Sequence, residues 1–353
     1  MTARILVLPG DGIGPEVTAS AVAVLHEVAA QGGYRFTFSD GLIGGAALTA
    51  GQSPLPADTL AAARSADAVL LGAVGDPAFD CRPQGHRPES ALLQLRAALG
   101  LHANLRPARA WPGLEGVGPL KPAVLAGTDL IVVRELTGGL YYGEPRGVAD
   151  DGQSAVNTLR YSVGEISRVA HRAFTLARSR RSRMVSVDKA NVLEVSRLWR
   201  QTVSAIATGY PDVALTHEYV DAAAMKLALS PSSFDVLLTE NLFGDILSDE
   251  AGAICGSLGL LPSASLGKGP GLFEPVHGSA PAIAGRDMAN PVGAILSAAM
   301  LLEYGLGLAS DAARITAAVE ATLSAGARTA DLVEPGQESL GTRAFTEQVL
   351  ALL

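Results

Sequence analysis

The chain has 353 residues, a formal net charge of −8 and hydrophobic side chains at 48% of its positions. This length exceeds the size at which a single core usually stops growing, so two domains are expected. The acidic balance argues against nucleic acid or an anionic membrane as a main partner. Cys81 and Cys255 are too distant for a CxxC site and too few for a disulfide framework, which favours a reducing cytoplasm.

No secretion signal or membrane segment is predicted. Only a short apolar run precedes Pro9, and the apolar stretch 291–302 reaches Glu303 before it is long enough to span a bilayer. We therefore expect a cytoplasmic protein.

Strand patterns alternate with helix patterns along the first hundred residues. Strands are expected at 4–9, 34–39 and 67–73, and helices at 15–30, 56–64 and 88–99. This alternation predicts an α/β protein with a largely parallel sheet and helices on both faces. The glycine loop 10–14 has the spacing G-x-G-x-G, which differs from the dinucleotide-binding fingerprint. A tight strand-to-helix turn explains this loop at least as well.

Acidic residues follow two strands in the second half of the chain. A strand at 234–238 leads into a helix on which Asp245 and Asp249, four residues apart, share one face. Asp221 follows the strand expected at 215–220. Three such carboxylates suit Mg²⁺ or Mn²⁺, which bind oxygen ligands and leave positions for substrate and water. A solvated helix face is the alternative interpretation of Asp245 and Asp249.

The helix that begins at Pro88 has an unusual face, because Glu89, Leu92, Leu93 and Arg96 fall at i, i+3, i+4 and i+7. A core-facing side does not normally carry Glu and Arg at its two ends. A side that contacts an anionic ligand with an apolar branch can do so.

Two further arginines, Arg106 and Arg134, stand on strand-like runs. An internal salt bridge is the simplest interpretation of each arginine alone. Guanidinium groups also bind carboxylates through paired hydrogen bonds. Three arginines in a chain with candidate metal ligands therefore favour a dicarboxylate pocket.

Lys189 lies at the C-terminal end of the strand expected at 184–187, at the sheet edge where α/β enzymes keep their chemistry. Upstream, the glycine-punctuated turn 137–145 carries two tyrosines and leads into a predicted hairpin that returns through 156–161. A protruding hairpin cannot bury its own faces, so we expect a dimer contact there.

The loop 274–290 contains His277 among glycine and serine residues, ahead of a helix that Asn290 and Pro291 are expected to start as N-cap and first residue. The histidine is either a polar surface residue or a contact for phosphate or adenine. From about residue 310, two further helices are expected.

Five motifs, in one order along the chain, resemble those of the β-decarboxylating dehydrogenases, the isocitrate/isopropylmalate dehydrogenase family. They occupy residues 10–16, 104–107, 188–191, 241–249 and 274–281. The resemblance implies a fold that is not a Rossmann fold but two open α/β domains sharing a large sheet. The first domain would comprise 1–101 and 256–353. The second would comprise 102–255, with an arm at about 136–160, and would form a homodimer with shared active sites.

The family resemblance also implies roles for individual residues. Arg96, Arg106 and Arg134 would bind the substrate carboxylates. Tyr141 would protonate an enol, while Lys189 and Asp221, both supplied by the partner subunit, would contact the substrate and take its hydroxyl proton. Asp221, Asp245 and Asp249 would hold Mg²⁺ or Mn²⁺. The NAD site would comprise Ile13, Glu274, His277, Gly278, Ser279, Ala280, Ala282, Ile283 and Asn290.

Within the family, the stretches 71–77, 87–93 and 135–147 look like those of members that act on 3-isopropylmalate. The implied reaction is NAD-dependent oxidative decarboxylation to 4-methyl-2-oxopentanoate, a step of leucine biosynthesis. Glu89, Leu92, Leu93 and, from the other chain, Val192 would surround the isopropyl group. A third substrate carboxylate buried against Leu92 and Leu93 would lack a partner, which argues against isocitrate.

One position departs from the family pattern, because NAD-using members usually have Asp where this chain has Ala282. The Lys-Tyr pair of NADP-using relatives is absent too, so we expect NAD with weakened discrimination. Two alternatives remain: the same chemistry on another 3-alkylmalate, D-malate, tartrate or homoisocitrate, or a non-catalytic regulatory homologue. The regulatory homologue should have lost metal aspartates, Lys189 or Tyr141, and all are present.

Overall fold

The computed structural model describes residues 1–334 and 336–353, and the chain divides into two compact units. Unit 1 comprises Met1–Leu101, Trp111–Pro119 and Gly256–Leu353, and unit 2 comprises His102–Ala110 and Leu120–Cys255. Each unit combines strands with helices. Relative to the predicted boundaries, the difference is the segment Trp111–Pro119, which belongs to unit 1.

The sheet of unit 1 has the strand order β2-β1-β3-β12-β11. Its strands are β1 (Thr2–Gly10), β2 (Arg35–Asp40), β3 (Ala68–Ala73), β11 (Pro262–Gly267) and β12 (Gly271–Pro275). The pairs β1–β2, β1–β3 and β3–β12 are parallel, as predicted for the first strands, while β11 and β12 form an antiparallel pair. The prediction treated the region up to Phe273 as glycine-rich chain and missed this pair.

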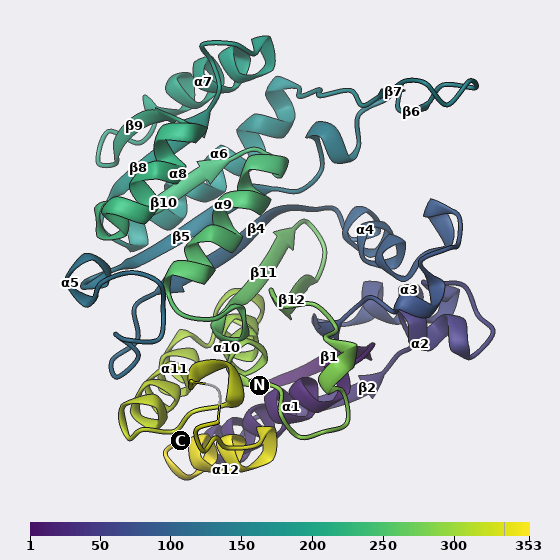
Figure 1. Ribbon diagram of the computed structural model, residues 1–353, viewed down its shortest axis with the longest axis vertical. Coiled ribbons are helices and arrows are strands. Elements are labelled where there is room, and N and C mark those ends of the chain that lie inside the picture. The colour runs from purple at the N-terminus through teal and green to yellow at the C-terminus, as the bar shows by residue number, and fades with distance from the viewer. Residues whose placement is uncertain (335) are drawn as a thin grey trace. The chain divides into compact units, whose positions relative to one another are not determined.

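Helices of unit 1 come from both ends of the chain, as the purple and yellow ribbons in Figure 1 show. They are α1 (Gly14–Gly32), α2 (Gly44–Thr49), α3 (Ala57–Ser65), α4 (Pro88–Ala98), α10 (Val292–Met300), α11 (Ala309–Ser324) and α12 (Thr342–Ala351). Helix α1 contacts α10 and α12, and α2 contacts α4. Alternate residues of the strands, among them Leu6, Leu8 and Leu71, pack with Ala91 and Leu95 of α4 in one buried cluster.

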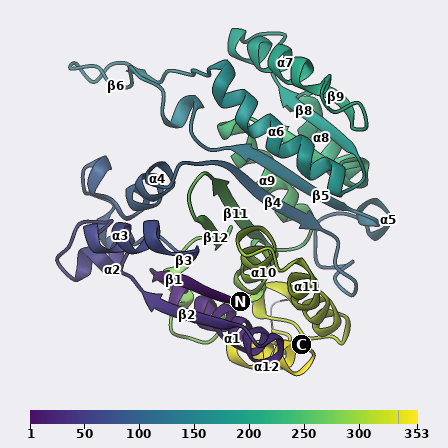
Figure 2. The same cartoon turned by 180° about the vertical axis from the view of Figure 1, so that it is seen from behind.

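Unit 2 has the strand order β4-β5-β10-β8-β9. Its strands are β4 (Leu101–Arg109), β5 (Asp129–Glu135), β8 (Arg183–Asp188), β9 (Ala214–Tyr219) and β10 (Val236–Thr239). Strand β4 runs antiparallel to β5, and the other neighbours are parallel. Helices α8 (Val220–Leu229) and α9 (Asn241–Ile254) lie on the face seen in Figure 1. Helix α6 (Val163–Ser179) lies on the opposite face, seen in Figure 2, where it contacts α7 (Glu194–Ala207).

The predicted protruding hairpin is present in unit 2, with strands of only two residues each, β6 (Gly147–Val148) and β7 (Ala155–Val156). It extends away from the helices of its unit (Figures 1 and 2). Val148 and Val156 are 70% and 51% exposed, so this hairpin leaves apolar side chains uncovered within one chain.

The first glycine loop is a packed turn. A Cβ at Gly10 would lie 2.0 Å from the carbonyl oxygen of Ala73, and a Cβ at Gly12 would lie 1.9 Å from that of Ser279. Both glycines also have positive φ angles, which disfavour any side chain. Between them, the buried Asp11 carboxylate accepts backbone hydrogen bonds from residues 45 and 46 in the first turn of α2 and from residue 75. The glycines are therefore required by close backbone contacts, in agreement with the interpretation as a tight turn.

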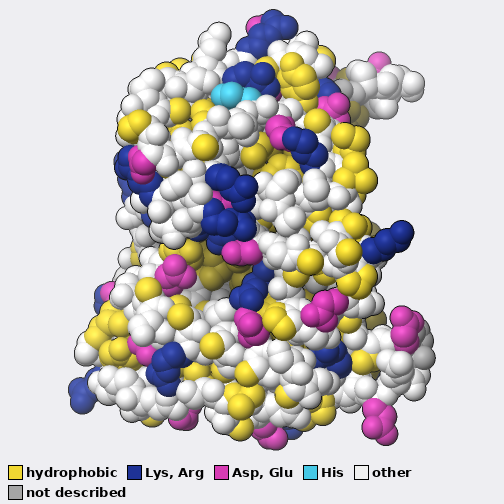
Figure 3. Space-filling model, turned by 90° about the vertical axis from the view of Figure 1, so that its left-hand side faces the viewer, with side chains coloured by type: hydrophobic (Ala, Val, Ile, Leu, Met, Phe, Trp, Pro, Cys, Tyr) yellow, Lys and Arg dark blue, Asp and Glu magenta, His cyan; other side chains and the backbone are white. Residues whose placement is uncertain are grey.

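The surface carries charges of both signs. On the face drawn in Figure 3, acidic and basic side chains are interspersed with small hydrophobic groups, and none of these types covers the face. Among the described residues, no helix combines the length and apolarity needed to cross a bilayer.

Candidate active site

The two predicted metal-binding aspartates lie one turn apart on α9. Glu240 caps this helix by accepting hydrogen bonds from the backbone N–H groups of Leu242 (3.1 Å) and Phe243 (2.8 Å). The cap fixes where the helix begins. Asp245 and Asp249 then share one face, because Nη1 of Arg106 lies 3.5 Å from Oδ1 of Asp245 and 3.1 Å from Oδ1 of Asp249.

Arg134, at the end of β5, is the second arginine of this cluster. It is 3% exposed and forms an ion pair with Asp245 through Nη1. Its Nε donates to the backbone carbonyl of Asn241 (2.9 Å) and to the side-chain oxygen of the same residue (3.0 Å). These contacts fix the orientation of the nearly buried guanidinium of Arg134, which suits recognition of a carboxylate.

Polar residues that had no predicted role orient these arginines. Asn104 accepts a hydrogen bond from Nε of Arg106 (2.7 Å), and Ser248 accepts one from its Nη1 (2.8 Å). Asn241 serves Arg134 and also donates to the carbonyl of Gly138 (3.1 Å). Asn104 and Asn241 lie inside the motifs 104–107 and 241–249. Their position in these motifs, close to the charged residues, could have indicated that they orient the arginines.

Tyr141 joins the cluster from the turn after β5. Its hydroxyl donates to Oδ2 of Asp245 (2.8 Å), and the guanidinium carbon of Arg134 lies 5.6 Å from the centre of its ring. Burial raises the pKa of Tyr141 to about 12, and the hydrogen bond and charge of Asp245 act in the same direction. The phenol therefore keeps its proton throughout the neutral range and can act as a proton donor.

Glu135 supports the turn that carries Tyr141. Its carboxylate is fully buried and accepts hydrogen bonds from the backbone N–H groups of Thr137 and Gly138, both at 2.8 Å. Burial raises the pKa of Glu135, although these hydrogen bonds oppose the rise. A buried acceptor with several donors fixes the turn between β5 and Tyr141.

Lys189 and Asp221 form a separate pair in unit 2. Nζ of Lys189 lies 2.5 Å from Oδ1 of Asp221, and this hydrogen bond lowers the pKa of the Asp221 carboxyl. Asp221 lies in the first turn of α8, immediately after β9, where the prediction had it at a strand end. The side chain of Asp221 is 67% exposed and that of Lys189 is 27% exposed, so both atoms are open to a ligand.

The three aspartates are not gathered within one chain. Among the described residues, no group of three His, Cys, Asp or Glu side chains is arranged to hold a metal ion. Asp245 and Asp249 nevertheless fit a divalent cation, because they are carboxylates on one helix face with partly open oxygens. Burial and the charge of Asp245 raise the pKa of Asp249, against the effect of Arg106. A bound cation would relieve this repulsion.

In unit 1, the face of α4 that was predicted to contact the substrate lies partly in the core and partly on the surface. Leu92 is half-buried against the cluster of Leu6 and Leu8, whereas Leu93 is 38% exposed and Glu89 is exposed. Arg96 is 8% exposed, and its Nη2 lies 2.7 Å from Oε1 of Glu274. The buried Nε of Arg96 has no hydrogen-bond partner, so this arginine retains a donor.

Glu274 and His277 begin the loop that was assigned to NAD. Glu274 forms the ion pair with Arg96. Nδ1 of His277 lies 3.0 Å from the carbonyl oxygen of Gly278, and its buried Nε2 has no partner. Burial lowers the pKa of His277, so its ring is neutral at pH 7. A neutral ring with an orphaned nitrogen is compatible with a contact to an uncharged heterocycle.

The rest of the assigned loop is held close to the first turn of the chain. The buried Ile13 donates its N–H to the carbonyl of Ser279 (2.8 Å), while Gly278, Ala280 and Ala282 are exposed and Ile283 is half-buried. Helix α10 begins at Val292, so Pro291 is its N-cap and was wrongly predicted as its first residue. Asn290 still accepts a hydrogen bond from the N–H of Val292 (3.0 Å) and donates to Asp331 (3.0 Å).

Comparison with known proteins places the chain in a family. The family model described as isocitrate/isopropylmalate dehydrogenase matches residues 4–349. A protein of Synechococcus sp. (strain JA-3-3Ab) named 3-isopropylmalate dehydrogenase is 57% identical, over 100% of this chain and 93% of its own. A protein of the same name from Synechocystis sp. is 56% identical, over 100% and 98%. The crystal structure of isocitrate dehydrogenase from Methylococcus capsulatus is similar with a TM-score of 0.88, at 34% identity over 99% of both chains.

Proposed function

Because the chain belongs to the isocitrate/isopropylmalate dehydrogenase family and has its fold, we propose that it oxidises 3-isopropylmalate with NAD and releases CO₂. The product would be 4-methyl-2-oxopentanoate, and the reaction would serve leucine biosynthesis in the cytoplasm. The observation that carries this proposal is the likeness, over the full chain, to relatives named 3-isopropylmalate dehydrogenase.

Binding of the substrate carboxylates is assigned to Arg106 and Arg134 of unit 2 and Arg96 of unit 1. A guanidinium has five N–H donors. Arg96 has a buried Nε without a partner in the structure. Arg134 is held in orientation by Asn241. These arginines are preorganised, so little side-chain entropy is lost when a dicarboxylate binds.

The proton transfers are assigned to three residues. Lys189, paired with Asp221, would accept the proton of the substrate hydroxyl as C2 is oxidised. The C–C bond of the β-carboxylate of the resulting keto acid then breaks with loss of CO₂, and Tyr141 would donate its phenolic proton to the enol carbon. When bound, NAD would supply the hydride acceptor, and Mg²⁺ or Mn²⁺ at Asp245, Asp249 and Asp221 would polarise the oxygen at C2.

A homodimer would bring the separated residues together, with Lys189, Val192 and Asp221 supplied by the partner. Support comes from apolar side chains that a single chain leaves uncovered in unit 2: Val148 and Val156 on the hairpin, Met225 and Leu229 on α8, and Ile246 on α9. Val192 is 62% exposed, as expected for a residue that contacts a ligand from the neighbouring chain.

Choice of substrate is assigned to the α4 face. Leu92 and Leu93 present partly exposed apolar side chains, which would accept the isopropyl branch of a substrate. A substrate with a third carboxylate at this position would bury it without a partner. Initial rates of cofactor reduction with Mn²⁺ and NAD should therefore be highest on 3-isopropylmalate in a panel with isocitrate, homoisocitrate, D-malate and tartrate. A higher kcat/KM on an acid without the branch would contradict this assignment, and activity on none would favour the regulatory homologue.

Binding of NAD is assigned to the loop from Glu274 to Asn290 and to Ile13. Ala282 is exposed and offers no carboxylate to accept hydrogen bonds from a ribose or to repel a 2′-phosphate. We expect the wild-type chain to prefer NAD over NADP less strongly than the Ala282→Asp variant does. The preference should differ about tenfold, the effect of one charge-assisted hydrogen bond that the wild-type chain lacks. The ratio of kcat/KM values measures this, and a preference of the wild-type chain for NADP would contradict it.

A further inference from the structure

In the second half of the loop 274–290, the segment 285–287 is hydrogen-bonded to the helices α1 and α12 of the same unit. The Glu16 carboxylate of α1 accepts a hydrogen bond from the backbone N–H of Gly285. Two residues later, Oδ1 of Asp287 accepts a hydrogen bond from the N–H of Arg343 (3.0 Å), and the carbonyl of Asp287 accepts one from that of Thr342 (3.3 Å). The loop is thus joined by Glu16 to the first turn of α1 and by Asp287 to the first turn of α12.

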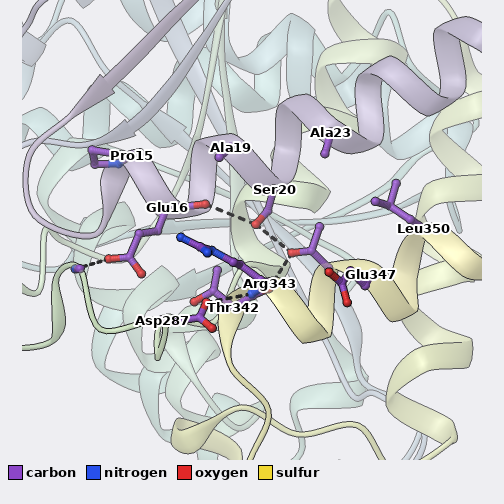
Figure 4. Close-up of a pocket in the computed structure, with 12 residues that line it drawn as sticks. Pro15, Glu16, Ala19, Ser20, Ala23, Asp287, Thr342, Arg343, Glu347 and Leu350 are labelled. Atoms are coloured by element: carbon purple, nitrogen blue, oxygen red, sulfur yellow. Dashed lines mark hydrogen bonds between the residues drawn. The ribbon is translucent and has the colours of Figure 1, made fainter.

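On one side, this part of the loop borders a cavity of about 510 Å³, lined by α1, α12 and residues 285 and 287. Glu16 and Asp287 are among the residues that line it, with the small side chains of Ala19 and Ala23 along α1 (Figure 4). A cavity leaves neighbouring atoms without partners on one side. On the side of the cavity, the bonds of Glu16 and Asp287 therefore help to fix the loop.

The backbone at the ties adopts an unusual conformation. Gly285 has a φ of 73° and Asp287 a φ of 54°, both in the left-handed region, which a residue other than glycine occupies only when its surroundings hold it there. Aspartate tolerates this region better than most residues. The Asp287 carboxylate also places a negative charge at the amino end of α12, where the helix dipole favours it.

We propose that Glu16 and Asp287 are positioning residues for cofactor binding, which they promote by holding the strained segment 285–287 and through it Ala282 and Ile283. This inference rests on the proposed assignment of NAD to the loop. The first half of the loop is fixed separately by the bond between Ile13 and Ser279 (2.8 Å). Loss of the Glu16 tie should therefore weaken cofactor binding without touching the groups that perform the reaction.

The test measures the dissociation constant for NAD of the free dimer by calorimetry, and kcat and KM with 3-isopropylmalate. Glu16→Ala should raise the dissociation constant about tenfold, which equals about 1.4 kcal/mol. Glu16→Gln, whose amide oxygen can still accept from Gly285, should restore most of this loss. Asp287→Asn, which also tolerates the left-handed conformation, should weaken NAD binding to a smaller extent. In all three variants, kcat and the KM for 3-isopropylmalate should stay within about twofold of wild type.

Glu347→Ala is the matched control, because Glu347 lines the same cavity but makes no hydrogen bond to the loop among the described residues. This variant should leave NAD binding unchanged. An unchanged dissociation constant in Glu16→Ala, or equal losses in Glu16→Ala and Glu16→Gln, would overturn the proposal. If the wild-type chain binds no nicotinamide cofactor, the proposed function fails instead. Hydrogen exchange at Gly285 then decides, since Glu16→Ala must accelerate it if Glu16 holds the loop.

Discussion

Replacing Lys189 with alanine should lower kcat on 3-isopropylmalate by about 10²–10⁴-fold, the range usual for loss of a general base. The side-chain nitrogen Nζ of Lys189 lies 2.5 Å from Oδ1 of Asp221, and the Lys189 side chain is 27% exposed. Alanine removes the proton acceptor and leaves the Arg134 and Asp245 pair untouched. The KM for the substrate should change far less than kcat, because the carboxylates are bound by the arginines. Steady-state rates with NAD and Mn²⁺ measure this.

Lys226→Ala is the control for Lys189→Ala. Lys226 also pairs with a carboxylate in unit 2, that of Glu218, but belongs to the exposed part of α8 and has no assigned role in the reaction. Its loss should change kcat by less than about twofold, since exposed ion pairs contribute little. A wild-type kcat in Lys189→Ala would contradict the assignment of the base.

Asp245→Asn should be the second most damaging change, lowering kcat/KM by about 10²–10³-fold. Asp245 contacts Arg106, Arg134 and Tyr141. Removing its charge weakens the ion pair of the buried Arg134, at a cost below the roughly 3–5 kcal/mol of a fully buried pair because the Asp245 side chain is 34% exposed. It also removes one of the two oxygen-bearing charges on α9 that would bind Mg²⁺ or Mn²⁺, so a higher metal concentration should recover part of the activity.

The same substitution should be visible in the titration of Tyr141. The charge and hydrogen bond of Asp245 both raise the pKa of this phenol, so Asp245→Asn should bring it from about 12 towards the ordinary value of 10, while the contribution of burial remains. Phenolate absorbance, with Tyr141→Phe as the blank, measures the shift. Asp212→Asn, which breaks the exposed pair with Arg178, should alter neither the titration nor kcat/KM. An unchanged Tyr141 titration in Asp245→Asn would contradict the described contact.

Local patterns in the sequence predicted most of the elements that carry the site. Apolar runs located β5 and β10, and the four-residue spacing of Asp245 and Asp249 predicted the shared face that Arg106 contacts. The pair β11–β12 was missed because Pro262–Gly267 is rich in serine and glycine and has few residues with high strand propensity. Its pairing with Gly271–Pro275, and not its own sequence, makes it a strand.

Partners of the charged residues could not be read from local patterns. Arg96 pairs with Glu274, 178 residues away, and Arg134 is oriented by Asn241, 107 residues away. Only the fold brings these side chains within hydrogen-bonding distance. The structure also adds Glu16 and Asp287, whose bonds to Gly285 and Arg343 depend on how α1 and α12 approach the loop.

Product analysis on 3-isopropylmalate tests the central claim most directly. With NAD, Mn²⁺ and a limiting amount of the acid, we expect equal amounts of reduced NAD, CO₂ and 4-methyl-2-oxopentanoate, because the hydride leaves C2 before the carboxylate is lost. A 2-oxo dicarboxylate that accumulates without CO₂ would contradict the roles given to Tyr141 and Asp245. Absence of reduced cofactor would contradict the proposed dehydrogenase itself.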